Sequence, residues 1–339
     1  MSVSGIKKHT LLNDVKIAFI ADDIKNISEF GVFYNATFSL MLAAQELNIK
    51  ILLAESNNLK IVKNKIVAKF DEVILKREVG NHLKIKSSNE YSLDSFNVVF
   101  ARKDPPIDEN FIAYIQMLSM VSSKTLIVNN PEGILKANDK LFTLNFPKFT
   151  PPTIVTSHTA EILTFLSEYK EVVIKPIFDK GGNGVFYLNQ EVKKNVHSII
   201  ELSTKNEHRT VLVQKFIPEI VKGDKRIVLL NGNPIGSVIR VPKAGESIAS
   251  IDRGANVLPG ELSKRNLEIC EALKLPLMEK GLYFAAIDVI GDYLTEINVS
   301  CPAGIQPIEN LTGKPIAKEI IKWAVEKALS NERSTVEAR

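Results

Sequence analysis

Short apolar runs alternate with stretches of helical periodicity over the first third of the chain. Four of these runs predict strands, at residues 15–21, 51–54, 97–101 and 125–128, and the run at 97–101 predicts a buried one. Apolar positions at helical spacing predict a helix over residues 37–47, and Asp108 is a good N-cap for a second helix. Strands that alternate with helices are typical of a parallel sheet, so we expect an N-terminal parallel-sheet α/β domain over residues 1–130.

The remaining chain mixes short strands, helices and glycine turns. After the segment Thr150-Pro151-Pro152, residues 150–215 predict strand, helix, strand, glycine loop, strand, helix and strand. Further strands are expected at residues 226–230, 234–241 and 282–298, with helices near 261–280 and 314–330. We therefore divide the chain into the domain at 1–130, two α+β subdomains at 131–215 and 216–330, and a polar, frayed tail at 331–339.

Composition narrows the class of protein. The 339 residues are 45% apolar and 24% charged, which is ordinary for a soluble chain of two or three domains. The net charge of +4 comes without a long basic run, so we expect no nucleic-acid partner. We expect neither a signal peptide nor a membrane span. Cys270 and Cys301 lack the spacing of a metal site or a disulfide framework, and we expect a cytoplasmic protein.

Residues 287–298 carry the strongest chemical signal, because two apolar runs there flank a Gly-Asp turn. Glu296 and Asn298 are two apart on the second strand and share a face, while Asp288 lies on the first strand. Asp288 sits opposite Glu296 only if the loop holds an odd number of residues, and residues 291–293 supply three. Carboxylate and amide oxygens suit Mg²⁺. We predict a magnesium site here; a solvated acidic hairpin is the alternative.

A glycine-rich turn gives a second signal. A buried strand ends at Lys175 and leads into residues 179–184, where glycines let backbone amides approach an oxyanion closely. A lysine at a strand end adds a point charge for a phosphate. The pattern matches neither a P-loop nor a dinucleotide fingerprint, and taken alone it is equally consistent with a hairpin turn that binds nothing. Together with the acidic hairpin, it supplies the parts that magnesium-dependent phosphoryl transfer needs.

Motifs along nearly the whole chain resemble those of bacterial glutathione synthetases, a family of the ATP-grasp superfamily. The motifs are RKDPP (102–106), TLIVN (125–129), NDKLF (138–142), GDKR (223–226), DVIGD (288–292) and TEINV (295–299). The resemblance implies an ATP-grasp fold after the N-terminal domain, with two α+β subdomains clasping ATP. Residues 1–130 would then be the substrate domain, 131–215 the small lid subdomain with its linker, and 216–330 the catalytic subdomain.

The resemblance also implies roles for individual residues. ATP phosphates would be contacted by Lys140, Lys175, Gly181, Gly182 and Gly184. Adenine and ribose would be contacted by Gln214, Lys215, Phe216, Ile217 and Asp224. Two Mg²⁺, with Mn²⁺ as an alternative, would be bound by Asp288, Glu296 and Asn298. The peptide substrate would be bound by Arg102, Asp104, Arg226, Arg240 and Asn298, of which Arg226 and Arg240 would also be catalytic.

The implied reaction joins a carboxylate to an amine. ATP would convert the carboxylate of a γ-glutamyl peptide to an acyl phosphate, which the amine of an amino acid then attacks. Arg226 or Arg240 would stabilise the oxyanion that develops. The expected partners are thus small molecules, and the resemblance suggests a homo-oligomer, either a dimer or a tetramer.

One loop departs from the family pattern. In the expected lid at residues 246–256, Ile248 and Ser250 stand where the family has arginine and asparagine, and Arg253 is a candidate substitute. Cys301 stands where the family has serine, and we expect a small buried residue without a redox role. Three functions stay open: glutathione synthesis from γ-glutamylcysteine and glycine, ligation of a different donor or amine, and nucleotide binding without catalysis. The complete set of lysine, arginine and carboxylate side chains argues against the third.

Overall fold

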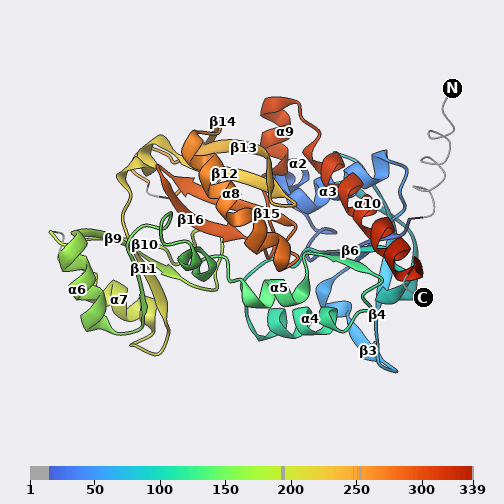
Figure 1. Ribbon diagram of the computed structural model, residues 1–339, viewed down its shortest axis with the longest axis horizontal. Coiled ribbons are helices and arrows are strands. Elements are labelled where there is room, and N and C mark those ends of the chain that lie inside the picture. Colours follow the sequence, from blue (N-terminus) through green and yellow to red (C-terminus); the bar gives the residue numbers. More distant parts are fainter. Residues whose placement is uncertain (1–14, 192–194, 247, 250, 252–253, 338–339) are drawn as a thin grey trace.

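The computed structural model describes residues 15–191, 195–246, 248, 249, 251 and 254–337. Within these residues the strands form three sheets, which follow one another along the long axis of the molecule (Figure 1). The order of strands and helices confirms the mixed α/β class predicted from the sequence. The domain boundaries remain a prediction.

The first sheet is mixed, whereas we expected a parallel one. Its parallel part consists of β1 (Ile17–Ile20), β2 (Ile51–Ala54), β6 (Val98–Ala101) and the edge strand β7 (Leu126–Val128). Its antiparallel part consists of β3 (Lys60–Val62), β4 (Lys65–Leu75) and β5 (Leu83–Ser92). The four parallel strands are entirely buried, because both faces of the sheet are covered by helices.

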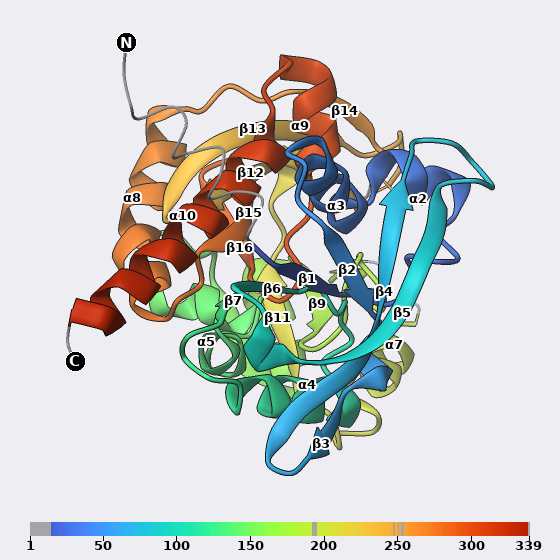
Figure 2. The same cartoon turned by 90° about the vertical axis from the view of Figure 1, so that its right-hand side faces the viewer.

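Alternate residues of β1 point to the two faces of this sheet. Ile17 and Phe19 pack with α3 (Ala36–Glu46) and α10 (Ile316–Glu337), and Ala18 and Ile20 pack with α4 (Glu109–Ser119). Figure 2 shows α3 and α10 on one side of the strands and α4 on the other. Helix α10 extends past residue 330, where we expected it to end, and it packs on α3 and against β6 and β7 of the first sheet.

The second sheet is small and antiparallel, in the order β10-β9-β11-β8. Its elements are β8 (Thr153–Thr156), α6 (Thr159–Tyr169), β9 (Glu171–Pro176), β10 (Phe186–Asn189), α7 (Val196–Thr204) and β11 (Val211–Lys215). This is the alternation predicted for residues 150–215, with the glycine turn between β9 and β10. The sheet has an apolar cluster of its own with α6 and α7.

The third sheet has the order β14-β13-β12-β15-β16. Its strands are β12 (Asp224–Leu230), β13 (Asn233–Val241), β14 (Asn256–Pro259), β15 (Phe284–Ile290) and β16 (Tyr293–Asn298). The remaining helices are α2 (Glu29–Tyr34), α5 (Pro131–Lys136), α8 (Lys264–Glu279) and α9 (Ile305–Thr312), with 3₁₀ turns at η1 (Ser56–Asn58), η2 (Leu93–Ser95), η3 (Leu141–Asn145) and η4 (Pro218–Lys222). Both large apolar clusters run through the first and third sheets, so these two sheets share a continuous core. No helix in the described part of the chain is both long and apolar enough to cross a membrane.

The hairpin of β15 and β16 corrects the predicted loop. Its turn has two residues, Gly291 and Asp292, because Ile290 pairs with Tyr293. The register then shifts by one residue at a β-bulge, where Thr295 has no partner in the ladder and donates a hydrogen bond of 3.1 Å to the Asp288 carbonyl. Asp288 consequently pairs with Glu296, as predicted, although the odd residue lies in the strand rather than in the loop.

Asn129 joins the first sheet to the third. It is buried at the end of β7, where its Nδ2 donates to the carbonyls of Phe284 (2.5 Å) and Val299 (2.8 Å). Its Oδ1 accepts from the Phe284 backbone N–H at 2.8 Å. This side chain therefore fixes the start of β15 and the end of β16 relative to the N-terminal sheet.

We expect Asn129→Ala to lower the free energy of unfolding of the shared core by about 3 kcal/mol, because three buried backbone groups lose their partner. Urea unfolding followed by tryptophan fluorescence measures the change, since Trp323 on α10 packs against this core. The control is Asn81→Ala, which removes an exposed amide bonded to Glu78. Equal unfolding midpoints for the two variants would contradict this role of Asn129.

Candidate active site

A cleft of about 960 Å³ lies between the carboxyl ends of the first sheet, the glycine turn and the third sheet. Every sequence-predicted site residue lines it except Gly184. Gly184 has φ +67° and faces Pro176, whose ring a Cβ at this position would approach to 2.7 Å. The structure therefore brings the predicted residues together, while their individual roles remain predictions.

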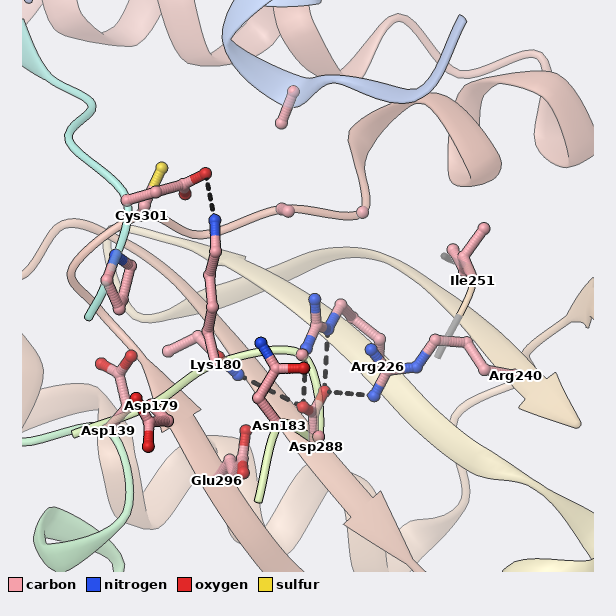
Figure 3. A pocket seen from close by; sticks show the side chains of 18 of the residues that line it. Asp139, Asp179, Lys180, Asn183, Arg226, Arg240, Ile251, Asp288, Glu296 and Cys301 are labelled. Atoms are coloured by element: carbon pink, nitrogen blue, oxygen red, sulfur yellow. Dashed lines mark hydrogen bonds and ion pairs between the residues drawn. The ribbon is translucent and has the colours of Figure 1, made fainter. Parts of the chain in front are cut away.

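Asp288 lies at the centre of the cleft with two arginines around its carboxylate (Figure 3). Arg226 binds it through both side-chain oxygens, from Nε at 2.8 Å and from Nη2 at 2.6 Å. Arg240 approaches the same carboxylate at 3.0 Å and also pairs with Asp224. These residues meet because β12 lies between β13 and β15, with Arg226 paired to Asp288 and Asp224 paired to Arg240.

The two arginines set the charge state of Asp288. Burial opposes ionisation of Asp288, but the charges of Arg226 and Arg240 hold the pKa of its carboxyl well below the usual range. In addition, Asp224 Oδ1 and Arg240 Nε are buried with no hydrogen-bond partner among the residues described. Buried polar atoms of this kind normally have partners, so both atoms are available to a bound ligand.

The predicted metal ligands share one face of the hairpin. Glu296 pairs with Asp288 across the strands, and Asn298 donates from Nδ2 to Asp288 Oδ2 at 3.3 Å. The described residues contain no cluster of three or more His, Cys, Asp or Glu side chains that could hold a metal ion alone. Two carboxylates and an amide oxygen still fit Mg²⁺, which takes few protein ligands and completes its shell with phosphates and water. For Asp288 to bind such an ion, Arg226 must turn away from its carboxylate.

Two lysines, Lys140 and Lys175, line the cleft beside the acidic hairpin. Lys175 on β9 donates from Nζ to Gln214 Oε1 at 3.0 Å, and Gln214 donates in turn to Thr153 Oγ1 at 3.0 Å. Burial lowers the pKa of Lys175. Lys140 donates from Nζ to the Asp179 carbonyl at 2.5 Å and lies 3.9 Å from Glu296. The two ammonium groups are thus positioned for a phosphate chain beside the acidic hairpin.

Arg102 and Asp104, the predicted peptide-binding residues of the first domain, both have protein partners. Arg102 is 4% exposed, and it donates to Thr37 Oγ1 at 3.0 Å and to the Pro302 carbonyl at 2.7 Å. Asp104 pairs with Lys180 of the glycine turn. Each residue therefore links the N-terminal domain to another part of the cleft wall.

Four further acidic residues line the cleft, and we predicted a role for none of them from the sequence: Asp22, Asp23, Asp139 and Asp179. Asp139 accepts from the Val299 backbone N–H at 2.9 Å and from Ser300 Oγ at 3.0 Å, and burial raises its pKa to about 6. Asp22 follows β1 and lies 3.0 Å from Lys103. The signals were present, since Asp139 precedes Lys140 in a motif and Asp22 follows a buried strand.

Three residues of the expected lid contribute apolar side chains to the cleft wall: Ile248, Ala249 and Ile251. Ser250 and Arg253 lie outside the described residues. Cys301 lies on the cleft wall and is only partly buried, unlike the small buried residue we expected. Burial nevertheless raises the pKa of its thiol, which stays protonated.

The chain is similar in sequence to known proteins over almost its whole length. Residues 15–134 match the family described as prokaryotic glutathione synthetase, N-terminal domain, and residues 139–313 match prokaryotic glutathione synthetase, ATP-grasp domain. It is 35% identical to the glutathione synthetase of Synechocystis sp. over 319 residues, which cover 91% of this chain and 98% of that protein. It is 36% identical to the glutathione synthetase of Nostoc sp. over 325 residues, covering 93% and 99%.

Solved structures share the fold at lower sequence identity. The D-cycloserine synthetase DcsG superposes with a TM-score of 0.65 at 14% identity, covering 92% of this chain and 99% of that one. A RiPP-associated ATP-grasp ligase from Chryseobacterium gregarium superposes with a TM-score of 0.61 at 17% identity, covering 92% and 97%. The arrangement of the three sheets is therefore that of ATP-grasp ligases.

Proposed function

The chain belongs to the prokaryotic glutathione synthetase family, and from that premise we propose that it is an ATP-dependent ligase that joins γ-glutamylcysteine to glycine, giving glutathione, ADP and phosphate. One observation carries the proposal: Arg226 and Arg240 meet the carboxylate of Asp288 in a cleft that Lys140 and Lys175 also line. That arrangement gathers cations around a place where two anions, a triphosphate and a carboxylate, must come together.

In the proposed reaction, the donor carboxylate attacks the terminal phosphoryl group of ATP and displaces ADP, giving an acyl phosphate. The glycine amine then attacks the acyl carbon, loses a proton and displaces phosphate. Lys140 and Lys175 hold the phosphate chain, while Arg226 and Arg240 donate hydrogen bonds to the donor carboxylate and later to the oxyanion. Magnesium, when held by Asp288, Glu296 and Asn298, offsets the charge of the transferring phosphoryl group. No side chain need act as a nucleophile, because positioning and electrostatics supply the rate enhancement.

The finer points of cofactor and assembly are also proposals. The family uses ATP and a divalent metal. We propose two Mg²⁺ per site, with Mn²⁺ as an alternative, because the hairpin ligands are all oxygen donors. We propose a homo-oligomer, either a dimer or a tetramer, in the cytoplasm, where ATP and reduced thiol peptides are available.

Lys175→Met should raise the KM for ATP by about 10- to 100-fold, because one charge-assisted hydrogen bond to phosphate is lost. Replacement of this partly buried lysine by an apolar side chain of similar length leaves no unpaired ammonium group at this position. Initial rates against ATP concentration measure the change, with the exposed lysine substitution Lys84→Met as the control. A KM equal to that of the control would remove Lys175 from the nucleotide site.

Isotope transfer tests the acyl phosphate directly. With ¹⁸O in the donor carboxylate, one labelled oxygen should appear in the phosphate released, since the carboxylate oxygen bonded to phosphorus leaves with it. Unlabelled phosphate would rule out this intermediate.

A second candidate function is ligation of a different amino acid or amine to a γ-glutamyl or other peptide carboxylate. It is favoured by Ile248 and Ile251, which line the cleft on the lid that carries an arginine in the family pattern. A panel of amino acids offered in place of glycine, with products identified by mass, separates the two functions.

A further inference from the structure

The glycine turn between β9 and β10 is attached on one side to two other parts of the molecule. The Ile107 backbone N–H donates to the Phe178 carbonyl at 3.0 Å, and Lys180 pairs with Asp104, which ties the turn to the N-terminal domain. Lys140 Nζ donates to the Asp179 carbonyl at 2.5 Å, which ties it to the linker before β8. Residues 178–180 are therefore held in place before any ligand binds.

The other side of the turn meets the lid. The side chain of Ile248 lies over Gly182: a Cβ at residue 182 would be 2.7 Å from Ile248 Cγ2 and 3.4 Å from its Cδ1. Gly182 also has φ +74°, a conformation that favours glycine. Both residues line the cleft. Ile248 of the lid thus rests on the glycine turn through an apolar contact that needs a glycine on one side and the Cγ2 methyl group of a β-branched side chain on the other.

We propose that Ile248 is a positioning residue that locks the lid onto the glycine turn at Gly182, so that the two segments form one cover, and that this contact sets the share of ATP cleavage that ends in an amide bond. The inference rests on the proposed ligase function. It adds a residue outside the cluster of Arg226, Arg240 and Asp288 that controls how much ATP is cleaved for each amide bond formed.

The physical reason is the exclusion of water. An acyl phosphate is hydrolysed if water reaches it before the amine does, so the fraction of time that the cover stays closed controls the competition. The lid contributes Ile248, Ala249 and Ile251 to the cleft, and apolar side chains of this kind close by excluding water rather than by pairing charges. A weaker contact with Gly182 therefore lets water in without altering the groups that bind ATP or stabilise the oxyanion.

The test measures ADP released per amide bond formed, with γ-glutamylcysteine, glycine, ATP and Mg²⁺ all saturating. Ile248→Ala removes the atoms that touch Gly182, and we expect ADP per amide to rise about fivefold, because the closed cover loses apolar contact. Ile248→Val keeps the Cγ2 contact and should restore a ratio near that of the unaltered protein. Leu258→Ala, on an exposed position of β14, is the control for loss of an apolar side chain outside the cleft.

A pair of substitutions that enlarges residue 182 and shortens residue 248 tests the contact itself. Gly182→Ala should raise the amount of ADP released per amide bond, because the added methyl group pushes against Ile248. Combining it with Ile248→Ala should lower that amount again, because the clash is removed. The proposal is overturned if Ile248→Ala leaves ADP per amide unchanged, or if Gly182→Ala gives the same ratio with and without Ile248→Ala. Failure of the proposed function is a different result, because the unaltered protein would then form no amide at all.

Discussion

Glu296→Gln is expected to lower kcat by about 10²- to 10³-fold and to raise the magnesium concentration needed for half-maximal activity. Glu296 pairs with Asp288 across the hairpin, and its side chain remains 27% exposed to the cleft. Glutamine keeps the shape of the side chain but removes one of the two carboxylate charges that the hairpin offers. The effect should appear mainly in turnover, because magnesium acts on charge that develops during phosphoryl transfer.

The control for Glu296→Gln is Glu268→Gln on α8, which makes the same chemical change on a partly exposed side chain paired with Arg265. Steady-state rates over a range of Mg²⁺ concentrations compare the two variants. If Glu296→Gln keeps the magnesium dependence and turnover of the control, then the hairpin is not the metal site and the solvated acidic hairpin is the correct interpretation.

Arg226→Lys should also lower kcat by about 10²- to 10³-fold, although the charge is kept. Arg226 holds both oxygens of Asp288, and in the proposed reaction the same planar group turns to the donor carboxylate. Lysine has one ammonium group and cannot form the paired hydrogen bonds. Arg240 stays beside Asp288, so the buried carboxylate keeps a partner and the fold should persist.

Single-turnover measurements of ADP formation and amide formation show which step suffers in Arg226→Lys. Thermal unfolding of this variant checks that the fold is retained, and Arg209→Lys, at an arginine bonded to the Ser203 carbonyl in the small subdomain, is the matched control. Turnover close to that of the control would exclude Arg226 from the chemistry and leave it as a structural partner of Asp288.

The acidic hairpin shows how much of the site can be predicted from the alternation of residues along each strand. Alternation along each strand placed Glu296 and Asn298 on one face, and pairing logic placed Asp288 opposite Glu296; the structure confirms that pairing. The predicted three-residue loop was wrong, because a two-residue turn and a bulge at Thr295 satisfy the same parity. Parity alone cannot distinguish an extra residue in a loop from one in a strand, since both shift the register by one.

Contacts between distant segments were beyond prediction from periodicity. Nothing in the local pattern indicates that Asn129 bonds to Phe284, or that α10 packs on α3 on one face of the first sheet. Likewise, Arg102 looks free in its motif but is held by Thr37 and Pro302. Such contacts depend on how the sheets are placed in space, and a single sequence specifies that placement only through the whole fold.

In the lid, this chain differs from the family pattern in the chemical nature of one side chain. The sequence shows that Ile248 stands where the family has arginine, and this substitution leaves the acceptor open. Only the structure shows that Ile248 lies over Gly182, because the two residues are far apart in the chain and lie in loops that connect strands of two different sheets.

The most direct test of the central claim is magnesium-dependent ADP release with γ-glutamylcysteine and glycine, each omitted in turn, and with the product identified by mass. We predict stoichiometric ADP and glutathione when both substrates are present, and no amide product when either is missing. Amide formation only with another amine would show that the lid has changed the acceptor. Absence of any amide product, with ADP released regardless of the peptide and amine supplied, would contradict the assignment as a ligase.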